Sequence, residues 1–232
     1  LKTYRNKHLG QRCFIVALGP SLALDDLEKL KGEISFSLNS CFKLFDKTQW
    51  RPNYYVFQDS VAYEMWKDQI DHLDVPCVFF YNNLMIWNFG RDGIGFKSNE
   101  MYALALYIKK ICSKYPTKIK FSTDIYKYIY TGGTTVISII QIAVYMGFKE
   151  IYLLGADCDY TGPDLHHPAV EYDEDVLSKL DVSLLRNEGE KMIYSYAQYK
   201  IYLDRLGVKV YNATRGGKLE IFPRVNLDEL VR

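Results

Sequence analysis

Residues 13–22 read CFIVALGPSL, and this stretch decides the fold that we expect. Cys13–Leu18 is an uninterrupted apolar run with the length of a buried β-strand. Gly19 and Pro20 end the run, and Ser21 is a natural N-cap for the helix-like stretch that follows. A strand that turns through such a loop into a helix is typical of a nucleotide-binding α/β domain.

Short apolar runs alternate with helical patterns along the rest of the chain. This alternation predicts βαβ units, right-handed crossovers and a mainly parallel sheet covered on both faces. We therefore expect one Rossmann-like, doubly wound α/β domain over residues 1–232. The expected strands are Cys13–Leu18, Ile34–Leu38, Tyr54–Phe57, Cys77–Tyr81, Glu150–Leu154 and Val208–Tyr211, and the expected helices are Ser21–Lys31, Asn99–Lys114, Val136–Met146 and Glu188–Leu206.

Composition narrows the class of protein. The 232 residues are 48% hydrophobic and 25% charged, which suits one domain with a sizeable core. The net charge of +1 argues against nucleic acid as the main partner, because binding to phosphate backbones usually needs a basic excess. No signal peptide and no apolar run of about 18 residues is present, so we expect no transmembrane segment. A cytoplasmic location follows, with a peripheral position at the inner face of the membrane left open.

The five cysteines are odd in number and scattered. No two of them have zinc-ligand or redox spacing, and most lie in apolar segments. We expect reduced core thiols at Cys13, Cys41, Cys77, Cys112 and Cys158.

Two segments interrupt the alternation of strands and helices. Asn82–Ser98 is rich in Asn, Gly and aromatic residues, and Asp157–Asp181 is acidic with two histidines. Loops of this length in a compact domain are usually functional or disordered. We expect a lid-like loop over about 157–181.

Ligands of open parallel sheets bind outside the carboxyl ends of the strands, so the residues after each strand are candidate site residues. After the first strand, Gly19 permits close backbone approach, Pro20 stiffens the turn, and free N–H groups at the helix start suit a phosphate. The loop lacks the three spaced glycines of the dinucleotide fingerprint and the Gly-Lys-Ser/Thr of the Walker loop. An ordinary capped turn stays open as the alternative.

The next two expected strands also end in polar residues. Asn39 follows the second strand, where a dinucleotide-binding fold normally has an acidic residue for the ribose. Its amide offers a donor and an acceptor, which suits a base edge or a sugar hydroxyl. Gln58 and Asp59 follow the third strand. Routine polar strand ends are the alternative for all three.

Two later segments carry more chemistry. Gly133, Thr134 and Thr135 lead directly into an apolar helix, which makes a phosphate cradle. After the next strand, Asp157 and Asp159 have the spacing of paired carboxylates that hold a divalent metal such as Mg²⁺. Solvated loop charge is the alternative.

His166 and His167 follow in the same loop. A histidine acts as a general base near neutral pH without a large pKa shift. A structural role is the alternative, and a metal site of the two histidines with an aspartate lacks the usual ligand spacing.

Taken in order, Gly-Pro-Ser, Asn39, Thr-Gly-Gly-Thr-Thr and the run Gly147–Asp157 resemble one superfamily. It includes the small bacterial sialyltransferases that use CMP-sialic acid, the Maf-type flagellin glycosyltransferases and the MptE-like hydroxymethylpterin diphosphokinases. The likeness spans roughly Cys13 to Tyr211 and implies a GT-A-like variant of the sialyltransferase type. The tail Val210–Glu220 resembles the closing segment of MptE-like proteins encoded with surface-polysaccharide genes, which favours sugar transfer.

The resemblance also implies roles for individual residues. A loop histidine, His166 or His167, would deprotonate the acceptor, with Asp157 also in the active site. Tyr160, with Arg215 as a second candidate, would stabilise the departing phosphate without a metal. The implied nucleotide-binding residues are Gly19, Pro20, Ser21, Asn39, Asp59, Gly133, Thr134, Thr135, Asp157 and Tyr160.

Two positions depart from the family pattern. Ala17-Leu18 replaces the usual Gly-Asn before Gly-Pro-Ser, and Asp159 stands where a tyrosine is expected. The extra carboxylate leaves open whether a metal is used or the donor differs. No cofactor is firmly implied, and Mg²⁺ is left open.

The sequence thus favours an inverting glycosyltransferase of bacterial surface polysaccharide or glycoconjugate synthesis. It would transfer a sugar, such as a nonulosonic acid, from a nucleotide-sugar donor, with a CMP-linked donor favoured, to a glycan or lipid-linked acceptor. One alternative is ATP-dependent pyrophosphoryl transfer to a hydroxymethylpterin, with Asp157 and Asp159 on Mg²⁺. Another is a non-catalytic nucleotide- or sugar-binding module. Assembly into a homo-oligomer is left open.

Overall fold

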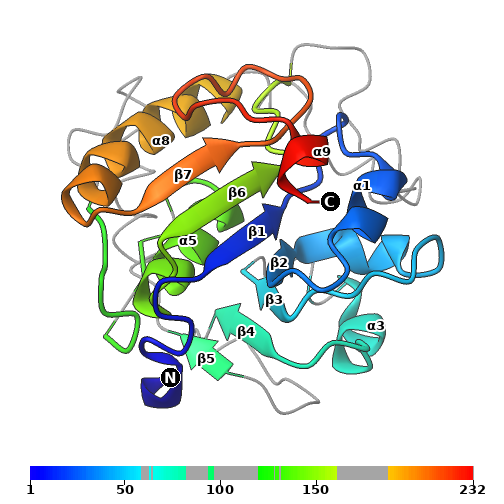
Figure 1. Ribbon diagram of the computed structural model, residues 1–232. Coiled ribbons are helices and arrows are strands. Elements are labelled where there is room, and N and C mark those ends of the chain that lie inside the picture. Colours follow the sequence, from blue (N-terminus) through cyan, green and yellow to red (C-terminus); the bar gives the residue numbers. More distant parts are fainter. Residues whose placement is uncertain are drawn as a thin grey trace.

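Seven parallel strands form one sheet in the computed structural model, in the order β5-β4-β3-β2-β1-β6-β7. The structure describes residues 1–58, 63, 65–81, 94–96, 120–127, 129–130, 132–160 and 188–231. Along the chain, β1 to β5 step outward on one side of β1, whereas β6 and β7 add to its other side (Figure 1). This arrangement confirms the doubly wound, Rossmann-like fold.

All six expected strands are present, two of them with the expected ends and the others with ends displaced by at most two residues. The strands are β1 (Arg12–Val16), β2 (Ser35–Leu38), β3 (Tyr54–Phe57), β4 (Val78–Tyr81), β5 (Ile94–Phe96), β6 (Glu150–Leu154) and β7 (Lys209–Asn212). The helices are α1 (Leu24–Lys29), α3 (Lys67–Asp71), α5 (Thr135–Tyr145), α8 (Glu188–Arg205) and α9 (Leu227–Leu230), with 3₁₀ helices η1 (Lys2–Tyr4) and η2 (Asn39–Leu44). The expected helix Asn99–Lys114 lies outside the described residues.

The structure corrects the expectation for Asn82–Ser98, which we read as loop throughout. Strand β5 lies within it and pairs in parallel with β4 at the edge of the sheet. Its three residues are too few for an apolar alternation to be recognised in the sequence. Strand β5 is recognised by its pairing with β4 and not by a local sequence pattern.

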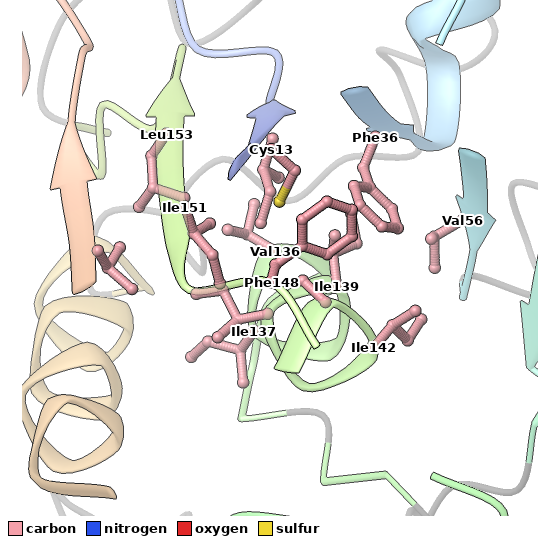
Figure 2. Close-up of a cluster of buried hydrophobic side chains, with 14 of the residues drawn as sticks. Cys13, Phe36, Val56, Val136, Ile137, Ile139, Ile142, Phe148, Ile151 and Leu153 are labelled. Carbon is pink, nitrogen blue, oxygen red and sulfur yellow. The ribbon is translucent and has the colours of Figure 1, made fainter. Parts of the chain in front are cut away.

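Helices cover both faces of the sheet, and β1 shows how the core is divided between them. Cys13 and Ile15 point to the face covered by α5 and α8, whereas Phe14 and Val16 point to the face covered by α1 and α3. Figure 2 shows the first of these cores, with side chains of α5 between Phe36, Val56 and the strands β1 and β6. The continuous apolar runs follow from this double coverage.

Helix α5 is the central element of that core, and its ends are well defined. The Thr134 hydroxyl accepts a hydrogen bond from the Val136 N–H at 3.4 Å and caps the start. Gly147, with φ +92, ends the helix, where the Phe148 N–H donates to the Ala143 carbonyl at 3.1 Å. Apart from Val144, every residue of α5 is buried. No helix in the described part of the chain combines the length and apolarity needed to cross a membrane.

Candidate functional site

The carboxyl ends of β1 and β6 meet at the point where the strand order reverses. Strands β1 and β6 are direct neighbours, while the connections that follow them run to opposite sides of the sheet. Open α/β sheets bind their ligands in the crevice at such a switch point. The loops after β1, β6 and β7 come together there, as the following contacts show.

Gly19 lies directly against Asp157. The Gly19 N–H donates to the Gly155 carbonyl at 2.7 Å. A Cβ atom on Gly19 would lie 1.8 Å from Asp157 Oδ2 and 2.5 Å from the Gly155 oxygen, so no other residue fits without a shift of backbone. The sequence predicted that Gly19 permits a close backbone approach. In the structure, the group that approaches Gly19 closely is the side chain of Asp157.

Ser21 turns toward the same carboxylate. Its hydroxyl donates to Asp157 Oδ2 at 2.8 Å. This corrects the prediction that Ser21 caps the following helix: α1 begins at Leu24, and its N-cap, Ala23, makes no side-chain hydrogen bond. The loop instead joins the ends of β1 and β6, while Pro20 at its tip is exposed.

Asp157 is a buried carboxylate, with 5% of its surface exposed. Burial raises the pKa of Asp157 above its ordinary value, because desolvation disfavours the charged form. The hydrogen bond from Ser21 acts in the opposite direction, and the charge of Asp159 adds to the rise. A desolvated carboxylate in a crevice at a switch point is a candidate functional residue.

The raised pKa gives Asp157 a testable effect on stability. The folded protein binds this proton more tightly than the unfolded chain, so the carboxylate costs stability once the pH rises above its unfolded pKa of about 3.9. Relative to Asp157→Asn, the free energy of unfolding of the wild type should therefore rise as the pH falls from about 7 to about 4. Urea unfolding at a series of pH values measures this difference. A difference that is constant with pH, or of opposite slope, contradicts the assignment.

Asn39 follows β2, the other neighbour of β1, and its backbone is held in an unusual conformation. Its φ is +46, a left-handed value that Asn tolerates better than most residues. The Tyr55 hydroxyl donates to the Asn39 carbonyl and accepts from the Phe42 N–H at 3.0 Å. The side-chain oxygen of Asn39 is buried, and no donor among the described residues hydrogen-bonds to it. A ligand that carries a hydrogen-bond donor could satisfy this acceptor.

The start of α5 also lies at this edge of the sheet. Ser138, in its first turns, donates to Gln58 Oε1 at 2.5 Å, at the carboxyl end of β3. Thr134 is half-buried and hydrogen-bonded with Tyr196 of α8, and Thr135 is buried. Gly133 is exposed, with φ +87 and nothing within 4 Å of the position of a Cβ. The glycines and hydroxyls predicted before the apolar helix thus do stand at its start.

Asp159 forms an ion pair with a residue that we did not single out. Its Oδ1 lies 2.8 Å from Lys218 Nζ, in the loop after β7. Asp157, in contrast, accepts a hydrogen bond from Ser21. In the described part of the chain, no group of three or more His, Cys, Asp or Glu side chains is placed to hold a metal ion.

The loop after β7 forms the third side of the crevice. The Lys218 N–H donates to the Asp157 carbonyl at 2.7 Å, and a Cβ on Gly217 would lie 2.3 Å from that carbonyl oxygen. Gly216 faces Ser21, with 3.8 Å between its Cβ position and Ser21 Cβ. The apolar strand before this loop was predicted, but the loop's contacts with Asp157 were not, since they depend on β7 lying beside β6.

The remaining predicted site residues are placed as follows. The Tyr160 hydroxyl donates to Met192 Sδ of α8 at 3.8 Å. Asp59, His166 and His167 lie outside the described residues, as does most of the expected lid. Of the cysteines, Cys13, Cys41 and Cys158 are buried free thiols and Cys77 is half-buried, whereas Cys112 lies outside the described residues.

A polar hollow of about 660 Å³ lies elsewhere on the surface. Its lining residues precede β2, β3 and β4, so it is at the amino ends of the strands, opposite the crevice. Lys31 pairs with Glu28 there at 2.5 Å, and Arg51 lies 3.8 Å from Asp74. These charges are matched within the hollow, and we assign it no role.

Comparisons with known proteins identify a family by sequence and relatives by fold. The sequence model of the family described as 6-hydroxymethylpterin diphosphokinase MptE-like matches residues 1–163. No curated protein gives a significant match. The Maf glycosyltransferase of Magnetospirillum magneticum AMB-1 superposes with a TM-score of 0.59 at 15% identity, over 97% of this chain and 35% of that one. The chain thus spans about a third of the length of that enzyme, and the likeness shows a shared fold.

A second solved structure is also similar. It is the sialyltransferase CstII of Campylobacter jejuni in complex with a substrate analogue, cytidine-5′-monophosphate. The TM-score is 0.47 at 16% identity, over 94% of this chain and 87% of that one.

Proposed function

The chain belongs to the MptE-like family, and on that premise we propose that it is a nucleotide-dependent transferase that transfers a sugar. The observation that carries the proposal is the junction of Gly19, Ser21 and Asp157 at the switch point between β1 and β6. A nucleotide in this crevice would lie across the carboxyl ends of β1, β2 and β6.

Asn39 supports a nucleotide as the ligand. Its buried side-chain oxygen needs a donor, and an exocyclic amine of a base or a hydroxyl of a ribose supplies one. The exposed backbone of Gly133, next to the start of α5, suits the phosphate of the same ligand. Base or sugar recognition would thus come from the end of β2, and phosphate recognition from the start of α5.

The ion pair of Asp159 favours sugar transfer over pyrophosphoryl transfer. Pyrophosphoryl transfer from ATP relies on metal ions that bridge the phosphates. Here Asp159 is paired with Lys218 and Asp157 accepts from Ser21, so each carboxylate already has a partner within the protein. Sugar transfer from a CMP-linked donor breaks no bond within a phosphate chain. The departing CMP carries less charge than the nucleoside diphosphate released by other nucleotide-sugars, which favours a CMP-linked sugar.

The reaction that we propose inverts the configuration at the anomeric carbon. The bond between that carbon and the phosphate oxygen breaks, and its electron pair passes to the phosphate. The acceptor oxygen forms the new bond to the anomeric carbon, and its proton goes to His166 or His167 as the general base. Tyr160 would donate to the departing phosphate. The order of these residues resembles that of CMP-sialic acid-dependent sialyltransferases, and a glycan or lipid-linked glycan of a bacterial surface polymer is the proposed acceptor.

A thermal-shift screen tests the proposal. CMP, UDP, GDP and ATP are added with and without Mg²⁺, and the melting temperature is recorded. CMP at a hundredfold excess over its Kd should stabilise the protein by about 2.7 kcal/mol. For a domain of this size, that corresponds to a rise of about 5–10 °C. We expect the rise without Mg²⁺.

Asn39→Gly provides a matched variant for this screen. Glycine accepts the left-handed backbone of residue 39, so stability should change little while the shift with CMP shrinks. Asn6→Gly is the control, because Asn6 has a similar φ of +56 and lies at the end of α5 remote from the crevice. A shift with ATP that requires Mg²⁺ would favour the diphosphokinase. No shift with any nucleotide would contradict the site, and binding without turnover would favour a binding module.

A further inference from the structure

The loop Thr214–Lys218 is held rigidly against the crevice. Arg224 donates from Nη1 to the carbonyls of Thr214 and Gly216, at 2.9 and 3.0 Å, and from Nη2 to that of Gly217 at 3.2 Å. The Thr214 N–H donates to Asn212 Oδ1 at 3.0 Å. The Thr214 hydroxyl oxygen accepts from the Ala156 N–H at 3.0 Å, which ties the loop to the end of β6. A loop with its carbonyls bound in this way places its side chains before any ligand arrives.

The loop carries two cations, and their partners differ. Arg215 Nη2 lies 2.5 Å from Oδ1 of Asp26, a buried residue of α1, so this guanidinium anchors the loop to the helix. Lys218 pairs with Asp159, and half of its side-chain surface is exposed. Asp159 itself is one-third exposed. The ammonium group of Lys218 is therefore a half-exposed cation held beside Asp159, which lies two residues in sequence after Asp157, the partner of Ser21.

We propose that Lys218 binds the phosphate of the nucleotide and neutralises the charge that develops on it when the sugar leaves. This inference rests on the proposed function and adds a residue to it. A transferase needs a cation or hydrogen-bond donors for the charge that develops on the leaving phosphate. Lys218 supplies a cation on a backbone that is bonded to Asp157 itself.

Sugar transfer requires no change in the protonation of Lys218. The electron pair of the broken glycosidic bond goes to the phosphate oxygen, and the acceptor proton goes to the general base. The ammonium group stays protonated and shifts part of its hydrogen bonding from Asp159 to the phosphate. Asp159 holds the amine near this position while the crevice is empty.

Binding of CMP and of cytidine, measured by calorimetry on the purified chain, tests the proposal. The two ligands differ only in the phosphate. In Lys218→Met the Kd for CMP should rise about 10- to 100-fold, since a hydrogen bond to a charged group is lost. The Kd for cytidine should stay within about twofold, and Lys218→Arg should retain most of the affinity for CMP. Lys200→Met is the control, because Lys200 forms an exposed ion pair of 2.7 Å with Asp204 on α8.

The outcomes separate this inference from the proposed function. Equal losses of CMP and cytidine would assign Lys218 a structural role and overturn the inference. An unchanged Kd for CMP in Lys218→Met would do the same, while leaving the nucleotide site intact. Failure of the wild type to bind either ligand would overturn both the inference and the CMP-dependent function.

Discussion

Gly19→Ala should unfold at clearly lower urea concentration than the wild type and should lose nucleotide binding. The added Cβ would lie 1.8 Å from Asp157 Oδ2 and 2.5 Å from the Gly155 carbonyl oxygen. The Gly19 N–H is bonded to that same carbonyl, so the loop cannot retreat without breaking a hydrogen bond between the ends of β1 and β6. Overpacking of this kind typically costs about 1–3 kcal/mol, and a backbone clash lies at the upper end.

Gly216→Ala is the matched control for this substitution. It adds the same methyl group in the same crevice, but its nearest neighbour would be Ser21 Cβ at 3.8 Å, an ordinary contact. The free energy of unfolding of Gly216→Ala should differ from that of the wild type by no more than about 0.5 kcal/mol. The double variant Gly19→Ala/Asp157→Ala should recover only part of the loss, because the Gly155 oxygen remains in place. Equal stability of Gly19→Ala and Gly216→Ala would contradict the packing described for this crevice.

The double variant His166→Ala/His167→Ala should lower kcat by about 10²–10⁴-fold, the usual contribution of a general base. The reason is chemical: the acceptor hydroxyl would have to attack without transferring its proton to the protein. Nucleotide binding should be retained, since neither histidine is assigned to the donor. Single variants should show which of the two adjacent residues carries the effect.

His72→Ala controls for the loss of a histidine as such. His72 is exposed after α3, at the amino ends of the strands, and its Nδ1 lies 2.7 Å from the Asp68 carbonyl oxygen. The His72→Ala variant should leave kcat unchanged. The measurement is initial rate of sugar transfer at saturating donor. A loss of less than a few-fold in the double variant would remove both histidines from the mechanism.

The strands and the helix α5 could be predicted because their signals are local. Cys13–Leu18 and Ile151–Leu154 are apolar throughout, as expected of strands buried on both faces. Thr134 and Gly147 mark the ends of α5 by the residue types that cap helices. Strand β5 could not be predicted in this way, because three residues carry no recognisable period.

The site was predicted only in part. The positions of Gly19, Asn39 and Asp157 followed from a general property of parallel sheets, which gather the carboxyl ends of their strands at one edge. The role of Ser21 was misjudged, since a serine before a helix is usually its cap and here donates to Asp157 instead. Lys218 was missed because a lysine in a glycine-containing loop has no distinguishing local signal.

By itself, the sequence determined the succession of strands and helices and the polar residues at the strand ends, since each of these depends on side chains a few positions apart. Only the tertiary structure decided which of those residues meet. Ser21 reaches Asp157 across 136 positions of sequence, and Asp159 reaches Lys218 from the neighbouring strand. Such contacts depend on the order of strands in the sheet, here β2-β1-β6-β7. That order is set by how the whole core packs, and no local run of residues encodes it.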